Sequence, residues 1–460
     1  MKAGPVLQVL SCVLFLISTT TTSPATSAAA GGLTIRADLT HVDSGRGFTA
    51  SELLSRMASR SRARAASHHQ QLYRRRSSFS GGGHPATAAA APGTVGGLGT
   101  EYLIHLSIGT PRPHHVALTL DTGSDLVWTQ CTECAVCFDQ PSPPFDPSAS
   151  KTFAYVPCSD PICALSSVSA CVIHDHSCFY LDSYGDGSIT AGIVLRDTFT
   201  FVKGAAVPGI SFGCGTYNKG IYDTNESGIA GFGLGAQSLP SQLKVGRFSH
   251  CFTSMLGSSS NKSSSPVFLG TPPAGYGDLK NKFKSTPLKR NPTRPSNYFV
   301  SFEGITVGET RLPVDASAFA VRKDGSGGTV IDSGTGVTTF TAAVYEQLLG
   351  AFVAQVPLPL ASPEEAAAMG GYPCFSAASA AEARKVAVPR LVFHLEGADM
   401  DLPRENYMPV VDGSKLLCVV VGSTEGDLTL IGNFQQQNMH IVYDVEKSKL
   451  LFAPAQCDKM

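Results

Sequence analysis

Two short copies of one signature constrain this chain most. The first copy is Asp121-Thr122-Gly123-Ser124, and the second is Asp332-Ser333-Gly334-Thr335. Each follows an apolar run that predicts a β-strand, because residues 116–120 alternate with a period of two and Val330-Ile331 is typical of a buried strand. In both copies a carboxylate precedes a hydroxyl, a glycine and a second hydroxyl. The glycine lets backbone approach closely, and the hydroxyls can hold the carboxylate oxygens in one geometry.

The signatures belong to a longer repeat. The first half runs Ser107-Ile108-Gly109-Thr110, the Asp121 signature and Ile229-Ala230-Gly231, and the second runs Ile305-Thr306-Val307-Gly308, the Asp332 signature and Leu430-Ile431-Gly432. A single tetrapeptide of this kind is equally consistent with a surface turn. Two copies within a repeat of similar spacing instead indicate two lobes of one ancestral design. A pseudo-twofold axis would then place the two aspartates face to face.

Together with its other motifs, the sequence resembles the pepsin-type aspartic endopeptidases, and within them the plant nepenthesin-like group. The resemblance covers about Thr100 to Cys457 and is carried by Asp121 to Trp128, Tyr184-Gly185-Asp186-Gly187-Ser188, Ile229 to Gly233, Val330 to Thr335 and Ile431 to Asn438. It implies an all-β, bilobal pepsin-like fold, with two pseudo-symmetric β lobes and an active-site cleft between them. It also implies hydrolysis of peptide bonds in polypeptides at acidic pH, with no cofactor and no metal.

The resemblance assigns roles residue by residue. Asp121 and Asp332 are the catalytic pair. The supporting residues are Thr122 and Ser333, which bridge the lobes, Ser124 and Thr335, which bind the outer carboxylate oxygens, and Gly123 and Gly334. Tyr184, Gly185 and Asp186 belong to a flap that closes over substrate, with Trp128 directing its N–H toward the Tyr184 phenol. Without the resemblance, residues 184–188 predict only a hairpin turn, and Trp128 only a packed core aromatic.

This arrangement suits acid catalysis. Two aspartates a hydrogen bond apart cannot both ionise cheaply, so the pair is expected to hold one proton over a wide acidic range. The ionised carboxylate can then accept a proton from a water molecule while the protonated one polarises a peptide carbonyl. The titration belongs to the pair, so the proton is assigned to neither aspartate.

Composition and the N-terminus indicate an exported globular protein. The chain has 460 residues, 43% hydrophobic and 15% charged, which is enough for two domains with a large core. Lys2, the apolar stretch Val6 to Ile17 and the small residues after it predict a signal peptide over residues 1–30. No later stretch reaches the roughly 20 apolar residues of a membrane helix. We therefore expect a soluble monomer in the extracellular space (apoplast) or the vacuole.

Cysteine counting supports export. Excluding Cys12 of the predicted signal leaves twelve cysteines, which allows up to six disulfides. Seven lie within residues 131–178, where nepenthesin-like proteins carry an insertion, so at least one must pair outside the segment if all are oxidised. The alternative for Cys131-x-x-Cys134-x-x-Cys137 is a zinc site, with His174 or His176. Sequons at Asn225 and Asn261 predict glycosylation.

Residues 31–98 have a different composition and are expected to form a prosegment. Residues 1–98 contain ten Lys and Arg and three Asp and Glu, a net charge of +7, so the remainder of a chain with net charge −1 carries −8. A basic prosegment lying across an acidic core follows, with a helix over Ala50 to Arg64 and a mature chain starting shortly before Glu101. The N-terminal lobe is predicted over residues 99–275 and the C-terminal lobe over 276–460, with a helix over Ala342 to Val356.

Three other functions are consistent with parts of the sequence. A binding protein on the same scaffold, like the plant xylanase inhibitors, would tolerate a broken signature, whereas both signatures are complete here. DNA binding by the basic N-terminal region ranks last because that region is the expected prosegment, so no nucleic-acid partner is expected. Gly231-Phe232-Gly233-Leu234-Gly235 is superficially similar to a nucleotide-binding loop, but no alternating strands and helices surround it, and Cys251 stands where the acidic residue should be.

Overall fold

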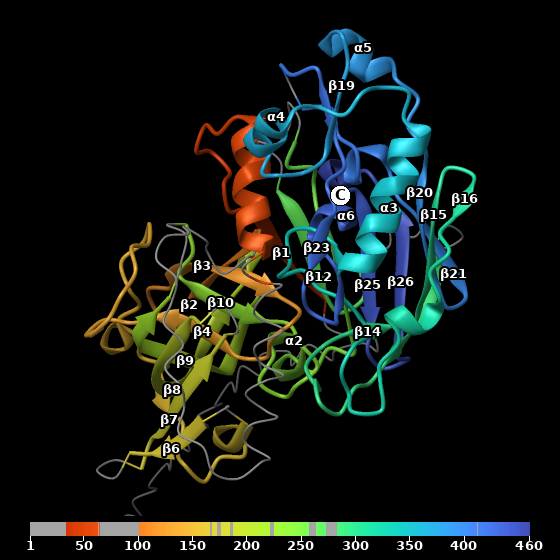
Figure 1. The fold of residues 1–460 in the computed structure, drawn as a ribbon. Helices are drawn as coiled ribbons and strands as arrows, with labels where there is room; N and C mark the ends of the chain where they lie inside the picture. The colour runs from red at the N-terminus through yellow and green to blue at the C-terminus, as the bar shows by residue number, and fades with distance from the viewer. Residues whose placement is uncertain are drawn as a thin grey trace, which may run out of the picture. The chain divides into compact units, whose positions relative to one another are not determined.

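The computed structural model describes residues 34–62, 64, 101–165, 168–172, 176–184, 187–220, 225–256, 264–272, 283–411 and 413–460. Within this part of the chain, β-structure dominates, and twenty of the strands join in one sheet that extends through both halves of the sequence. The all-β, bilobal prediction is therefore confirmed (Figure 1). No helix of the described residues has both the length and the apolar character needed to cross a membrane.

Antiparallel strands make up most of the first half. They are β2 (Tyr102–Ile108), β3 (His114–Asp121), β4 (Val127–Gln130), β5 (Ala154–Tyr155), β6 (Val168–Cys171), β7 (Cys178–Ser183), β8 (Ile189–Thr200), β9 (Ala206–Lys219), β10 (Gly228–Gly231), β11 (Arg247–Cys251) and β12 (Ser265–Leu269), with the short helix α2 (Leu239–Gln242). The longest pair, β8 and β9, turns through Lys203 and Gly204, whose φ angles of 63° and 78° suit a tight turn.

The second half contains more helix. Its strands are β13 (Lys284–Lys289), β14 (Phe299–Val300), β15 (Phe302–Val307), β16 (Thr310–Arg311), β17 (Thr329–Ile331), β18 (Thr339–Thr341), β19 (Cys374–Ser376), β20 (Leu391–Leu395), β21 (Ala398–Asp401), β22 (Leu416–Cys418), β23 (Gly422–Thr424), β24 (Thr429–Ile431), β25 (Met439–Asp444) and β26 (Lys449–Pro454). Its helices are α3 (Ala342–Gln355), α4 (Pro363–Ala368), α5 (Ala380–Lys385) and α6 (Asn433–Gln436). Helix α3 ends one residue before the predicted boundary, because Val356 adopts an extended conformation.

The two halves repeat one strand arrangement. In the first, β3 runs parallel to β10, which places Gly231 opposite Asp121. In the second, β17 runs parallel to β24, which pairs Ile331 with Ile431. The repeated sequence elements thus become repeated strand pairs, and each pair ends at one aspartate signature.

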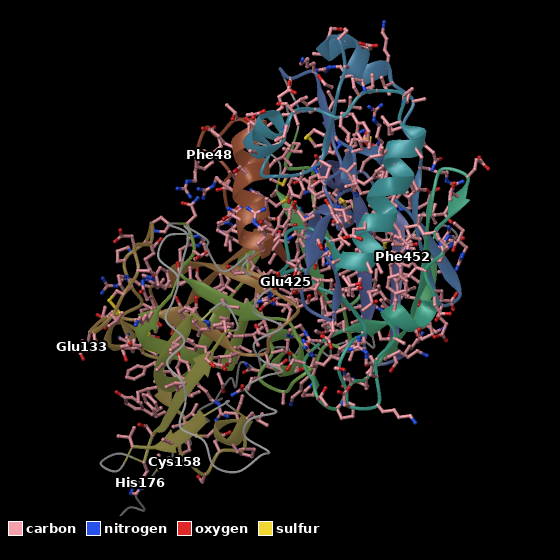
Figure 2. The ribbon with its side chains drawn as sticks, viewed as in Figure 1. Phe48, Glu133, Cys158, His176, Glu425 and Phe452 are labelled. Atoms are coloured by element: carbon pink, nitrogen blue, oxygen red, sulfur yellow. A yellow bond between two sulfur atoms is a disulfide. The ribbon has the colours of Figure 1, made fainter. Side chains whose placement is uncertain are left out.

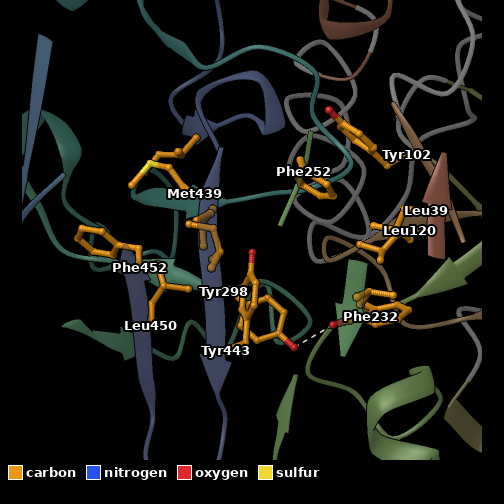
Figure 3. Close-up of a cluster of buried hydrophobic side chains, with 14 of the residues drawn as sticks. Leu39, Tyr102, Leu120, Phe232, Phe252, Tyr298, Met439, Tyr443, Leu450 and Phe452 are labelled. Atoms are coloured by element: carbon orange, nitrogen blue, oxygen red, sulfur yellow. Dashed lines mark hydrogen bonds between the residues drawn. The ribbon is translucent and has the colours of Figure 1, made fainter. Parts of the chain in front are cut away.

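A buried aromatic cluster joins the halves. The Phe248 ring from β11 stacks on Tyr443 from β25 at 4.5 Å, and Tyr298 packs against Tyr443 at 4.6 Å. The Tyr298 hydroxyl donates to the carbonyl of Phe232 at 2.8 Å, as drawn in Figure 3. Because aromatic side chains of this size dominate core energetics, the cluster holds the ends of both signature strands in one rigid unit.

The N-terminal segment, by which we mean the described residues 34–62 and 64, is part of the same sheet. Strand β1 (Ile35–His41) pairs antiparallel with β12 and with β2. The sequence analysis did not predict this strand. A helix covers residues 50–62 and residue 64, as predicted, and we call it the N-terminal helix. In Figure 1 it is the orange-red helix beside α4, and Arg62 donates to the carbonyl of Gly370, just after α4, at 3.0 Å.

The twelve cysteines outside the predicted signal form six disulfides. The pairs are Cys131–Cys214, Cys134–Cys137, Cys158–Cys171, Cys163–Cys178, Cys251–Cys457 and Cys374–Cys418. The pairing confirms six bridges and shows that Cys131 is the member of the cysteine-rich segment that pairs outside it. Figure 2 shows Cys158 and His176 at the far end of the first half, on the insertion. The zinc alternative is wrong, because Cys131, Cys134 and Cys137 are all consumed in disulfides.

Candidate active site

Each signature forms a loop immediately after its strand, and each loop holds its own carboxylate in the same way. Asp121 Oδ1 accepts from the amide of Gly123 at 3.0 Å, and Asp332 Oδ1 accepts from Gly334 at 2.9 Å. The other oxygen of each carboxylate accepts from a hydroxyl, at 2.6 Å from Ser124 and 2.7 Å from Thr335. The two aspartates are thus fixed by matching sets of donors.

A reciprocal pair of hydrogen bonds connects the loops. The amide of Thr122 donates to Ser333 Oγ at 3.0 Å, and the amide of Ser333 donates to Thr122 Oγ1 at 2.9 Å. The Ser333 hydroxyl also donates to the carbonyl of Leu120 at 3.1 Å. Both aspartates and both bridging residues are buried. The structure therefore brings all eight signature residues to one place, and each hydroxyl lies where the resemblance expects it.

Arg64, at the end of the N-terminal helix, lies between the two carboxylates. Its Nη2 donates to Asp121 Oδ1 at 2.7 Å, and its Nε donates to Asp332 Oδ2 at 3.4 Å. The guanidinium is buried, with Asp121 and Asp332 as its ion-pair partners. One cation therefore contacts both carboxylates and offsets part of their charge. Sequence analysis predicted a basic segment over the core but did not single out this arginine.

A second buried arginine anchors the same helix. Arg60 donates through Nε to Glu101 Oε1 at 2.9 Å and through Nη2 to Asp43 Oδ2 at 2.8 Å, and it also contacts Glu101 Oε2. Burial opposes ionisation of Glu101, but the charge of Arg60 and bonds from Arg60 and His41 outweigh it, so the pKa of Glu101 is lowered. The pKa of Arg60 is raised, since its two carboxylates outweigh its own burial.

This cluster is the group of described residues whose composition could suit a metal. His41, Asp43 and Glu101 place their ligand atoms within 4.8 Å of one another. Arg60 already donates to both carboxylates, so the negative charge is balanced within the protein. We assign the cluster to anchoring the N-terminal segment and propose no metal there.

The described residues include the base of the predicted flap. Strands β7 and β8 form a hairpin with Ser183 opposite Ile189, and the amide of Tyr184 donates to the carbonyl of Ser188 at 2.8 Å. Trp128 Nε1 donates to the Tyr184 hydroxyl at 2.8 Å, and both side chains are buried. This is the geometry that the resemblance implies. Gly185 and Asp186, at the predicted tip, lie outside the described residues.

Of the two sequons, one is described. The side-chain amide of Asn225 donates to the carbonyl of Val42 at 2.6 Å, so this nitrogen is engaged with the N-terminal segment. A glycan would be attached at the same nitrogen. Asn261 lies outside the described residues.

Comparisons with known proteins agree with this geometry. A family model described as Xylanase inhibitor N-terminal matches residues 102–271, and one described as Xylanase inhibitor C-terminal matches residues 297–454. The chain is 37% identical to aspartic proteinase nepenthesin-1 of Nepenthes gracilis, over 91% of this chain and 89% of that protein. It is 38% identical to aspartyl protease family protein 2 of Arabidopsis thaliana, over 78% of this chain and 71% of that protein.

Solved structures show the same fold at lower identity. Conglutin gamma, a basic 7S globulin from lupine seeds, superposes with a TM-score of 0.59 at 17% identity, covering 76% of this chain and 91% of that chain. Basic 7S globulin from soybean gives a TM-score of 0.58 at 19% identity, covering 77% and 93%. At this identity the likeness concerns the fold alone.

Fold and relatives together define a pepsin-type aspartic endopeptidase acting on polypeptides. Within that class, the chain belongs to the family of the plant nepenthesin-like aspartic proteases.

Proposed function

We propose that the chain is a zymogen on the secretory route and that, after activation, it cleaves polypeptides at acidic pH through Asp121 and Asp332. The observation that carries the proposal is the matched pair of carboxylates, each held by a glycine amide and a hydroxyl and both facing Arg64. Once the guanidinium leaves such a site, two neighbouring acidic groups remain, and we expect a pair of this kind to hold one proton over an acidic range.

The proposed mechanism uses this chain's own groups. With one proton on the pair, the ionised carboxylate accepts a proton from a water molecule, and the resulting oxygen nucleophile attacks the peptide carbonyl carbon. The protonated carboxylate donates to the carbonyl oxygen as charge develops there. As the C=O bond re-forms, one hydroxyl of the tetrahedral intermediate returns a proton to the pair, the leaving nitrogen accepts a proton from the pair, and the C–N bond breaks, so the pair again holds one proton. The Ser124 and Thr335 hydroxyls hold the outer oxygens throughout.

In the precursor, we propose that residues 31–98 form an inhibitory prosegment following a signal peptide over residues 1–30. Three features support inhibition: β1 completes the sheet, Arg60 is held by Glu101, and Arg64 occupies the catalytic pair. The apolar face of the N-terminal helix adds to this hold, because Leu54, Met57 and Ala58 are buried in a cluster with residues of the second half. Lobes over residues 99–275 and 276–460 remain after removal.

The test is an assay of the purified full-length protein. It should be acidified and incubated with an unfolded protein substrate, alone, with pepstatin and with a chelator. The proposal expects cleavage at acidic pH that pepstatin abolishes and the chelator leaves intact. Inhibition of a xylanase without any cleavage would instead identify a binding protein on the protease scaffold, the alternative consistent with the descriptions of the matching family models.

A further inference from the structure

Asp125 directly follows the first signature and is enclosed by the glycine-rich loop of residues 231–235. Its Oδ1 accepts from the amide of Gly235 at 2.8 Å. Its Oδ2 accepts from the hydroxyl of Ser296, which lies in the second half of the chain. One carboxylate thus joins three segments that are far apart in the sequence.

The glycines of the loop leave the space that Asp125 occupies. A Cβ atom at Gly233 would lie 2.3 Å from Asp125 Oδ1, and one at Gly235 would lie 2.2 Å from Oδ2. At Gly231 it would lie 2.3 Å from the carbonyl carbon of Asp125. Real Cβ atoms do not approach so closely, so each of these positions requires glycine. The alternating glycines that superficially resemble a nucleotide-binding loop therefore allow the loop to pack directly against Asp125.

The same loop is tied to the catalytic signature and to the second half. The amide of Phe232 donates to the Asp121 carbonyl at 2.7 Å, and the amide of Gly233 donates to Ser124 at 2.8 Å. The amide of Leu234 donates to the Ser296 carbonyl at 3.0 Å, and the hydroxyl bond from Tyr298 to Phe232 lies alongside (Figure 3). Asp125 is the charged group at the centre of this junction.

We propose that Asp125 is a positioning residue for peptide hydrolysis: it locks the Asp121 loop to residues 231–235 and to Ser296, and so holds Asp121 in register with Asp332. The inference rests on the proposed function of the aspartate pair. Catalysis by a shared-proton pair depends on placement, and an error of about 1 Å can cost about 100-fold in rate.

The charge of Asp125 also acts on the pair. Burial raises the pKa of Asp125, bonds from Ser296 and Gly235 partly offset this, and the negative charge of Asp121 raises it further. Among the described residues, the Tyr298 phenol is a second titratable neighbour. Burial raises the pKa of Tyr298 and keeps it neutral, and Arg290 acts on Tyr298 in the opposite direction. Residues 231–235 contribute no charged side chain. Ionised Asp125 disfavours loss of the shared proton. Removing its charge should make that proton easier to lose.

The test compares Asp125→Ala, Asp125→Asn and Ser296→Ala with Asp146→Ala. Asp146 is a matched control, since its carboxylate also accepts from a backbone amide and a hydroxyl, both of Ser148, away from the signatures. Each full-length protein is acid-activated, its active sites are titrated with pepstatin, and kcat and KM are measured across pH. Hydrogen exchange is followed in the untreated precursors for peptides covering residues 121–126, 231–235 and 296–298.

Asp125→Ala should lower kcat at least about tenfold per active site with little change in KM, and Ser296→Ala should do so more weakly. Asp125→Asn keeps the shape, so it should retain most of kcat but move the basic limb of the pH profile to lower pH. A purely structural role would reduce the number of active sites and leave both kcat per site and the pH profile unchanged, which would overturn the proposal.

Failure of the two proposals can be told apart. If the wild type shows no pepstatin-sensitive cleavage, the proposed function fails, yet exchange in the precursor still decides the role of Asp125. Faster hydrogen exchange in the three segments of Asp125→Ala, with exchange in Asp146→Ala the same as in the wild type, supports the proposal that Asp125 holds these segments together. Unchanged exchange in those segments refutes it, even if Asp125→Ala folds poorly, because Ser296→Ala is measured beside it.

Discussion

Arg64 Nη2 lies 2.7 Å from Asp121 Oδ1, and the same guanidinium reaches Asp332. An arginine of the N-terminal helix therefore pairs with two buried carboxylates at once. Removing one partner from such a site is costly, because it leaves charge buried without compensation. We therefore expect this contact to help hold the N-terminal helix on the two aspartates.

Replacing Arg64 should weaken latency. Arg64→Gln removes the cation between the aspartates, so the precursor is expected to activate faster and at milder pH than the wild type. Arg62→Gln is the control, because Arg62 lies on the same helix and donates to Gly370 instead. Activation is followed by N-terminal sequencing and peptide cleavage over a pH series. Equal activation of the wild type and Arg64→Gln would show that Arg64 does not restrain the site.

Acid should release the N-terminal segment in part through Glu101. Its folded pKa lies below the ordinary value of 4.5, so its contribution is present above that value and is lost as pH falls through the lowered folded pKa. Glu101→Gln removes the charge at every pH and should destabilise the docked segment by about 3 kcal/mol, at the low end for a buried pair because Asp43 still binds Arg60.

Release of the segment in Glu101→Gln is therefore expected at higher pH than in the wild type, measured by limited proteolysis and mass spectrometry. Glu303→Gln, at an exposed position of β15, provides the control for removal of one charge. A release pH that is the same in all three proteins would exclude Glu101 as an acid-sensitive anchor.

Several of these relationships could be predicted from the sequence and others could not. The signatures lie in loops whose donors are local, so the resemblance could place Ser124 and Thr335 on the outer carboxylate oxygens. Arg64 could not, because the N-terminal region contains nine arginines and only the docking of the helix decides which one reaches the aspartates. Strand β1 could have been predicted from the sequence, because the apolar residues Ile35, Ala37 and Leu39 alternate with polar ones. All three are buried in the structure.

Two further misses have physical reasons. The stretch from Ala361 to Ala387 has no clear periodicity in the sequence, although Ser362 and Glu365 form a capping box that marks the start of α4. Its high alanine content hides periodicity, because alanine is compatible with either face of a helix. The role of Asp125 depends on Ser296, 171 residues away, and no local pattern reports a contact of that kind.

Acid should also lower the stability of the folded protein, because His250 is buried in its uncharged form. Burial, followed by the nearby His440, lowers the pKa of His250 from 6.5 to about 3. The unfolded chain then binds more protons between about pH 3 and 6.5, so stability falls as pH falls through this window. In an Asp332→Asn background that prevents autolysis, His250→Leu should remove on the order of 4 kcal/mol of this acid-dependent loss.

Thermal unfolding at several pH values measures the effect of His250→Leu. His115→Leu, at an exposed histidine, is the control. Parallel stability curves for the Asp332→Asn protein with and without His250→Leu, between about pH 3 and 6.5, would contradict the prediction.

The disulfides should differ in their contributions to stability. Replacing both Cys131 and Cys214 with serine opens a bridge between residues 83 apart and should cost about 2–5 kcal/mol. Replacing Cys134 and Cys137, only three residues apart, should cost less, because a short loop loses little entropy when closed. Denaturant unfolding measures both. Thiol labelling of the denatured, unreduced mature protein should find no free cysteine, and labelling of two or more would contradict the six-bridge assignment.

Peptide hydrolysis by Asp121 and Asp332 together is tested by the cleavage rate of Asp121→Asn and of Asp332→Asn at acidic pH. Each change removes one half of the shared-proton pair while preserving its shape, so we predict near-total loss of activity with normal folding. Asp315→Asn, at an exposed helix cap, should retain wild-type activity. Appreciable turnover in either folded variant, or wild-type activity that a chelator abolishes, would show that the two aspartates do not act as the hydrolytic pair.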